Sequence, residues 1–258
     1  MKESEVIASI SLIFYERPIN MIHPYKTREG GATVTVFVPY DCHNHPFCIN
    51  KEEYADLTGF SVESICRSIA RMHAITPECD FVFTGGEPLA DLSALQEMLD
   101  CIPSSHKIYI NTTLPVSEFQ SESDIVEFTR RNRDKITCIN VSRHMQKYVV
   151  ESNDALLSRL AVPFRINCVL YKDYPRADLI PYLERFRKIP GANIQFRFDY
   201  TATTPENLYD EAGDPILRDL KEISRYTGLD GCRMRCGFHF DYKGMEMTYH
   251  KTLPYSTI

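Results

Sequence analysis

Several features of secreted and membrane proteins are missing from this sequence of 258 residues. No apolar run approaches the ~18–20 residues that a membrane-spanning helix needs. The chain opens with the polar stretch Met1 to Glu5 and has no apolar segment there, so we expect no signal peptide. A repeat of fixed period, a low-complexity tract and a long linker are also absent from the sequence. These absences predict one structural domain of a cytoplasmic protein that does not bind a membrane.

Basic residues are too few for a broad phosphate-binding face. Lys and Arg total 29 against 35 Asp and Glu, and the net charge is −6 at pH 7. We therefore expect no nucleic-acid partner, while a small local basic patch stays open. The hydrophobic share of 43% and the charged share of 25% are ordinary for a globular protein, and the length suits a single α/β domain.

Cysteine occurs in an odd number, nine, and is scattered along the chain. Without an export signal, we expect these residues to be reduced thiols. Four of them lie at apolar positions and are expected in the core: Cys66, Cys101, Cys138 and Cys168.

Strand-like and helix-like segments alternate through the middle of the chain. The expected strands are Thr33–Val38, Asp80–Phe83, Lys107–Asn111, Thr137–Val141, Phe164–Leu170 and Asn193–Phe198. The expected helices are 62–72, 92–102, Asp124–Arg131, Asn153–Leu160, Asp178–Ile189 and Ile216–Tyr226. Ser61 is a suitable N-cap for the first helix, and Gly228 would close the last one. Right-handed winding of six such units predicts an α/β fold, a partial (β/α)6 TIM-like barrel with helices outside a parallel sheet.

The two ends of the chain add short extensions to this barrel. Residues 1–32 form the first extension, in which Ile7–Tyr15 is a candidate strand. Residues 33–228 form the barrel. Residues 229–258 form a tail with a hairpin, Phe238–Tyr242 and Met245–His250, around Lys243 and Gly244. The whole is expected to be one structural domain.

A strand-to-helix turn with the sequence Gly85-Gly86-Glu87-Pro88 follows the second expected strand. Two adjacent glycines let the backbone approach a ligand closely, and the proline stops the strand and redirects the chain. A helix is expected from Asp91. Alone, such a turn indicates only a tight βα loop.

A cysteine loop follows the first expected strand, about one βα unit before this turn. It contains Cys42, His43, His45, Phe47 and Cys48. Thiolates clustered in one loop at a strand end are a common way to hold iron–sulfur clusters. The two loops together resemble the radical S-adenosylmethionine (radical SAM) superfamily. That family has a C-x3-C-x2-C loop after its first barrel strand, with an aromatic residue before the last cysteine, and a GGEP-type turn after its second strand.

The resemblance has one gap, since one cysteine of the C-x3-C-x2-C loop is missing. Five residues separate Cys42 from Cys48, where the family has six, and one cysteine placed between His45 and Pro46 would restore the pattern. The missing residue shortens the loop by ~3.3–3.6 Å. Three explanations stay open: a cysteine absent from this sequence, a genuine deletion, or a substitute ligand. Candidates for a substitute are His45, Cys232 and Cys236.

The resemblance implies a radical SAM enzyme with a [4Fe-4S] cluster and S-adenosyl-L-methionine as cofactors. The cluster would cleave SAM reductively to a 5′-deoxyadenosyl radical, which abstracts hydrogen from an unidentified substrate, either a small molecule or a peptide. An electron donor such as flavodoxin or ferredoxin is implied as a partner. The implied metal ligands are Cys42 and Cys48. The implied cofactor-binding residues are Phe47, Gly85, Gly86, Glu87, Pro88, Ser142 and Arg143.

Two other functions stay open from the sequence. A barrel with an uncompensated deletion could bind SAM or a nucleotide without catalysis. A zinc protein could instead use four thiolates, those of Cys42, Cys48, Cys232 and Cys236. Zinc would account for the paired cysteines but not for the GGEP turn. Arg233 and Arg235 form a small positive patch that could meet an acidic substrate group.

Overall fold

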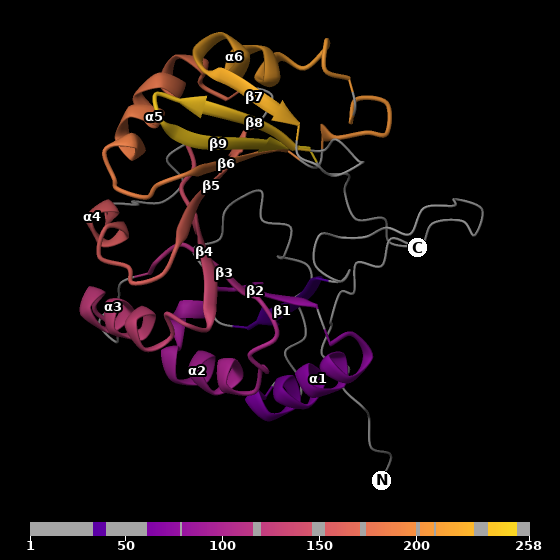
Figure 1. Ribbon diagram of the computed structural model, residues 1–258, viewed down its shortest axis with the longest axis vertical. Coiled ribbons are helices and arrows are strands. Elements are labelled where there is room, and N and C mark those ends of the chain that lie inside the picture. Colours follow the sequence, from indigo (N-terminus) through magenta and orange to yellow (C-terminus); the bar gives the residue numbers. More distant parts are fainter. Residues whose placement is uncertain are drawn as a thin grey trace, which may run out of the picture. The chain divides into compact units, whose positions relative to one another are not determined.

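A computed structural model of the chain has an α/β fold in which strands alternate with helices (Figure 1). It describes residues 33–39, 61–77, 79–115, 120–145, 153–170, 174–199, 202–208, 210–229 and 237–251. The strands are β1 (Thr33–Val38), β2 (Asp80–Gly85), β3 (Ile108–Thr112), β4 (Ile136–Ser142), β5 (Phe164–Leu170), β6 (Ile194–Phe198), β7 (Arg225–Leu229), β8 (Gly237–Tyr242) and β9 (Met245–His250). The α-helices are α1 (Val62–Ile75), α2 (Leu92–Asp100), α3 (Glu122–Arg131), α4 (Asp154–Leu157), α5 (Leu179–Arg187) and α6 (Pro215–Ile223), with 3-10 helices η2 (Pro88–Ala90) and η3 (Arg176–Asp178).

The chain divides into two compact units. Unit 1 comprises residues 1–139 and 160–163, and unit 2 comprises residues 140–159 and 164–258. In unit 1, β1 pairs with β2 and β2 pairs with β3, both in parallel. Side chains alternate along β1, with the three valines buried. This period of two places one side of each strand in the core.

Local sequence signals determine where the helices of unit 1 begin. Ser61 caps α1 in a capping box with Ser64, and Asp91 caps α2 by accepting a hydrogen bond from the Ala94 amide. Ser121 and Asp124 form a second capping box at α3. Each cap satisfies amides that the first helical turn leaves without partners. Beyond these caps, apolar side chains line one side of each helix and are buried.

Unit 2 contains a sheet with strand order β5-β6-β9-β8-β7. β5, β6 and β9 run parallel, whereas β8 is antiparallel to both β9 and β7. The tail hairpin thus extends the parallel strands, with Lys243 and Gly244 at its turn, both at positive φ. The buried faces of α5 and α6 contribute Leu183, Phe186 and Leu220 to the core of this unit.

Most of the expected elements are confirmed, and β1, β5 and β9 begin and end at the predicted residues. The last helix is shorter than predicted, since α6 ends at Ile223 and Tyr226 lies in β7. Gly228 therefore does not close a helix; it has φ +141° beside a register shift between β7 and β8. The helix expected over Asn153–Leu160 is a single turn. The candidate strand Ile7–Tyr15 lies outside the described residues.

The expectation that all nine cysteines are reduced thiols is wrong for two of them. Cys66 and Cys101 form a disulfide bond, and Cys101 is exposed rather than in the core. Cys138 and Cys168 are buried, as predicted. Apolar character at helical spacing indicates which face a cysteine is on, but it does not reveal a partner that is 35 residues away.

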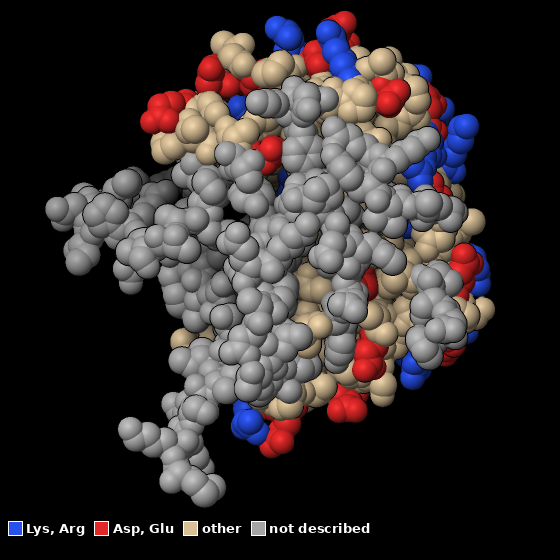
Figure 2. Space-filling model, turned by 180° about the vertical axis from the view of Figure 1, so that it is seen from behind, with Lys and Arg blue, Asp and Glu red and all other residues tan. Residues whose placement is uncertain are grey.

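Within the described ranges, no helix has both the length and the apolar character needed to cross a membrane. In the view of Figure 2, acidic and basic side chains are interspersed on the coloured part of the surface.

Candidate functional site

The carboxyl ends of β1 and β2 lie side by side in unit 1. Val38 and Gly85 are partners in the parallel register, and the Gly86 amide donates a hydrogen bond to the Val38 carbonyl oxygen at 2.9 Å. Gly85 has φ +112°, a conformation that favours glycine over any residue with a side chain. The Gly85–Pro88 turn is therefore fixed against the end of β1, and the carboxyl ends of parallel strands are where α/β folds bind ligands.

The Glu87 carboxylate points into the protein and anchors this turn to the end of β3. Its side chain is 2% exposed. One oxygen, Oε1, accepts hydrogen bonds from the Leu89 amide (3.0 Å) and the Thr112 hydroxyl (2.5 Å). The other, Oε2, accepts from the amide (2.7 Å) and the hydroxyl (2.8 Å) of Thr113. Four donors thus occupy the carboxylate, so Glu87 acts as a positioning residue for the turn.

Burial raises the pKa of Glu87 above its ordinary value, because the charged form loses its hydration. The hydrogen bonds from Thr112, Thr113 and Leu89 oppose this shift without cancelling it. A buried carboxyl without a full set of donors would be far more costly. Thr112 and Thr113 therefore supply three of the four hydrogen bonds that hold the carboxylate. Both threonines directly follow the third expected strand, and this position indicates that they lie near the carboxyl ends of the strands. No pattern in the sequence linked them to Glu87.

Arg143, one of the cofactor-binding residues that the resemblance implies, is fully buried in unit 2. Its guanidinium donates to the carbonyl oxygen of Ser142 (2.8 Å) and to Oδ1 of Asn153 (2.5 Å), and its Nε lies 3.4 Å from Oδ1 of Asp154. The Arg143 carbonyl oxygen accepts a hydrogen bond from the Tyr182 hydroxyl. Arg143 thus links the end of β4 to the start of α4. Ser142 beside it is half-buried.

A buried charged cluster lies in unit 2, at the carboxyl end of β9. Lys251 forms an ion pair with Oδ2 of Asp214 at 2.7 Å, and both residues are about 95% buried. The same oxygen accepts a hydrogen bond from the Tyr249 hydroxyl at 2.9 Å, and Lys251 also donates to the Asn207 carbonyl oxygen. Burial and the Asp214 charge raise the pKa of Tyr249. This cluster was not predicted, because the sequence gives no sign that Asp214 and Lys251 meet.

Asp214 also caps α6, since its Oδ1 accepts hydrogen bonds from the amides of Ile216 (3.0 Å) and Leu217 (3.1 Å). Both oxygens of this carboxylate are therefore engaged by groups within the protein. The cluster joins β9 to α6 and is a structural feature of unit 2.

A row of polar side chains crosses the parallel strands of unit 2. Asn167 on β5, Gln195 on β6 and Thr248 on β9 are partners in register. The Asn167 Oδ1 and Thr248 Oγ1 atoms are buried and have no hydrogen-bond partner. A buried polar atom without a partner is costly, so this row is a place where a ligand could bind. Its polar groups do not single out one class of ligand.

The residues of the metal sites expected from the sequence lie outside the described residues: Cys42, Phe47, Cys48, Cys232 and Cys236. Among the residues that are described, no group of three His, Cys, Asp or Glu side chains is arranged to hold a metal ion.

Two histidines and a cysteine do meet in unit 1. Nδ1 of His106 contacts the Cys79 carbonyl oxygen (2.7 Å), and its Nε2 contacts Nδ1 of His73 (2.8 Å). Both ring nitrogens of His106 are therefore engaged within the protein.

A search of protein families found no family model that matches this chain, and no curated protein matches it.

Proposed function

We propose that this protein is a radical SAM enzyme, built on a partial (β/α)6 barrel, that acts on an unidentified small-molecule or peptide substrate. The observation that supports the proposal best is the pairing of β1 with β2. The GGEP turn at the end of β2 is hydrogen-bonded to Val38 at the end of β1. Cys42 follows Val38 by only four residues in the sequence, so both loops of the motif start from the same edge of one sheet.

The proposal assigns a role to each part of the two loops. Cys42 and Cys48 hold the [4Fe-4S] cluster, and Phe47 shields it. The backbone of Gly85 to Pro88 receives the amino group of SAM. Positive φ at Gly85 and the buried anchor of Glu87 support this role, because they fix the turn before any ligand arrives. The cluster, when bound, supplies the electron that cleaves SAM to the 5′-deoxyadenosyl radical.

The resemblance implies that Ser142 and Arg143 bind the cofactor, and the ribose and carboxylate of SAM are the groups that they would contact. Ser142 keeps this role in the proposal. Arg143 would have to exchange its hydrogen bonds to Asn153 and the Ser142 carbonyl for a ligand carboxylate, so we assign it to support of the β4 end instead. Electrons would come from a small redox protein of the flavodoxin or ferredoxin type.

Metal content separates this proposal from its alternatives. The chain is reconstituted anaerobically with iron and sulfide, and iron, sulfide and zinc are measured per folded chain. We expect iron and sulfide in comparable amounts, lost in Cys42→Ser and Cys48→Ser and retained in the matched control Cys138→Ala, whose thiol is buried elsewhere. Zinc alone, lost also in Cys232→Ser, would favour the four-thiolate zinc protein, and no metal would favour a non-catalytic binding barrel.

An inserted cysteine tests the gap in the motif. Adding Cys between His45 and Pro46 should raise the iron content toward about four per chain. If the chain without the insertion already holds a full cluster, and the insertion does not change the iron content, the third ligand is a residue already present.

A further inference from the structure

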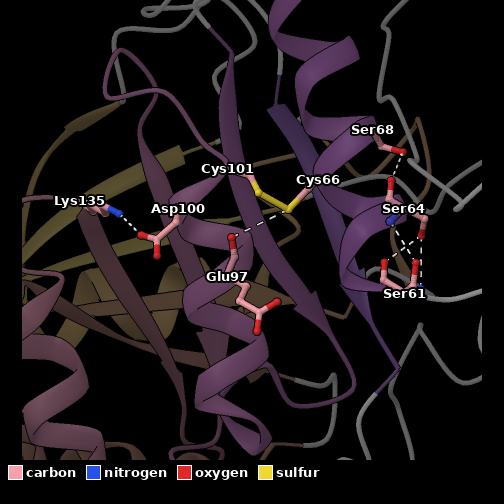
Figure 3. The surroundings of a disulfide bond; sticks show 8 residues. All are labelled: Ser61, Ser64, Cys66, Ser68, Glu97, Asp100, Cys101 and Lys135. Atoms are coloured by element: carbon pink, nitrogen blue, oxygen red, sulfur yellow. Dashed lines mark hydrogen bonds and ion pairs between the residues drawn. A yellow bond between two sulfur atoms is a disulfide. The ribbon is translucent and has the colours of Figure 1, made fainter.

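The disulfide between Cys66 and Cys101 joins two helices at the surface of unit 1 (Figure 3). Cys66 is in the second turn of α1, and Cys101 is the C-cap of α2. Their Cα atoms are 5.6 Å apart, a usual separation for bridged cysteines. Cys66 is half-buried, whereas Cys101 is exposed. Cys101 is therefore the more accessible of the two residues to a molecule in solution.

The other cysteines that the structure describes differ from this pair in exposure. Cys79, Cys138 and Cys168 are all buried. Burial also raises the pKa of Cys79, so its sulfur stays protonated. The protonated thiol is less reactive than the thiolate. Thiol chemistry in the described part of the chain is thus concentrated at the one accessible pair.

The carboxylate beside Cys101 is paired with a cation, which reduces its repulsion of an anionic thiol. Asp100, its neighbour in sequence, forms an ion pair with Lys135 and a hydrogen bond with Gln96. The hydrogen bond from Lys135 holds the pKa of Asp100 below its ordinary value, so this carboxylate is ionised. The ammonium group of Lys135 balances its negative charge. An incoming thiolate therefore meets a paired carboxylate and not a bare one.

Helix polarity indicates which sulfur leaves. Cys101 follows the last turn of α2, where the carbonyl end of the helix disfavours a negative charge. Cys66 is in the second turn of α1, away from the carboxyl end of that helix. Attack at the exposed Cys101 sulfur, with Cys66 as the leaving thiolate, satisfies both exposure and polarity.

We propose that the Cys66–Cys101 pair is a thiol–disulfide exchange site for small thiols of the glutathione class. A glutathione thiolate attacks Sγ of Cys101, the Cys66–Cys101 bond breaks, and the Cys66 thiolate takes a proton from water. A second glutathione thiolate then attacks the glutathione sulfur of the mixed disulfide and releases the Cys101 thiolate, which is protonated. The protein disulfide gains two electrons and two protons, and two glutathione molecules become one oxidised glutathione.

The reaction changes the restraint between two helices. α1 follows the segment that contains the cysteine loop, and α2 follows the GGEP turn. Reduction removes the covalent link between α1 and α2 and leaves their non-covalent contacts. Amide hydrogen exchange should therefore speed up in α1 and α2 and stay unchanged in α5 and α6 of unit 2.

Mass spectrometry of the full native chain tests the proposal. The protein is incubated in buffers with a range of reduced-to-oxidised glutathione ratios and no denaturant, quenched with an alkylating agent, and mapped by peptide. We expect the Cys66–Cys101 pair to open and re-form with the ratio while Cys79, Cys138 and Cys168 stay unmodified. Cys66→Ser should accumulate a glutathione adduct on Cys101, at least ten-fold more than Cys101→Ser accumulates on Cys66. Lys135→Met should slow the exchange several-fold.

Two results would overturn the proposal. A disulfide that opens only after denaturant is added would be a purely structural cross-link. Adducts that form on Cys66 as readily as on Cys101 would contradict the assignment of the attacked sulfur. Exchange in the wild-type chain decides the main point even if a variant fails to fold, and the mass readout is independent of any iron–sulfur cluster.

Discussion

The two units bury a carboxylate in different ways. In unit 1, Glu87 is surrounded by hydroxyl and amide donors from Thr112, Thr113 and Leu89. In unit 2, Asp214 is paired with the buried ammonium of Lys251 and the hydroxyl of Tyr249. The donors around Glu87 are neutral, and its pKa is raised. In a buried ion pair, removal of either partner leaves the other charge buried without compensation. The first arrangement positions a turn, and the second joins a strand to a helix.

Removing Asp214 should have the largest effect on stability. Asp214→Ala leaves the Lys251 charge buried without its partner and deletes the cap of α6, so the free energy of unfolding should fall by about 3–5 kcal/mol. Urea denaturation measures this loss. The matched control is Glu211→Ala, which removes an exposed ion pair with Lys221 and should cost below ~0.5 kcal/mol.

A double variant shows whether the ion pair itself is responsible. Replacing Lys251 with Met in the Asp214→Ala background should recover part of the loss, because no buried charge then remains. A loss below ~1 kcal/mol in Asp214→Ala would contradict the interpretation of the cluster as structural.

The disulfide should give the second largest effect, in unit 1. Cys101→Ser should lower the free energy of unfolding by about 2–4 kcal/mol under oxidising conditions, since the bond closes a loop with a sequence separation of 35 residues. Under reducing conditions, the variant and the wild type should differ little. If the free energy of unfolding differs between variant and wild type by the same amount in both conditions, the substitution acts through packing and not through loss of the cross-link.

Opposite pH dependences should distinguish two glutamates, one in each unit. The raised pKa of Glu87 means that its stabilising contribution is complete below pH 4.5 and is lost as the pH rises through its folded-state pKa. Hydrogen bonds from Lys243, Arg187 and Tyr242 lower the pKa of Glu184 to about 2, so its contribution is present above pH 4.5 and is lost as the pH falls through 2.

Matched glutamine variants test these directions by unfolding across the pH range. Glu87→Gln should flatten the decline in stability above pH 4.5, and Glu184→Gln should flatten the decline below it. The same slope change in both variants would refute the contrast between the units.

A surface ion pair should give the smallest effect. Glu63 and Arg67 lie one turn apart on α1 at 2.5 Å and are both well exposed. Glu63→Gln should therefore change the free energy of unfolding by less than ~0.5 kcal/mol, as measured by urea denaturation. A larger loss would show that α1 depends on this pair as well as on the disulfide.

Local patterns in the sequence accounted for most of the elements and for the turn at Gly85. Alternating valines predicted β1 to the residue, and Ser61 and Asp91 predicted two helix starts. The pattern failed at Tyr226, because apolar spacing continued past Ile223 into a strand that tertiary pairing with β8 stabilises.

Contacts between distant residues could not be predicted in the same way. The bond between Cys66 and Cys101 and the ion pair between Asp214 and Lys251 each depend on how separate elements pack. The threonine donors around Glu87 lie about 25 residues further along the chain, and the pairing of β2 with β3 brings them close. Local sequence thus predicts where strand ends lie, and packing determines which side chains meet there.

Formation of 5′-deoxyadenosine tests the central proposal most directly. The reconstituted protein is incubated anaerobically with dithionite and SAM, and the nucleoside is quantified by chromatography beside Cys48→Ser and the control Cys138→Ala. The proposal predicts product from the wild type and Cys138→Ala and none from Cys48→Ser. A folded, reconstituted wild type that forms no product, or a Cys48→Ser variant that forms as much as the wild type, would contradict it.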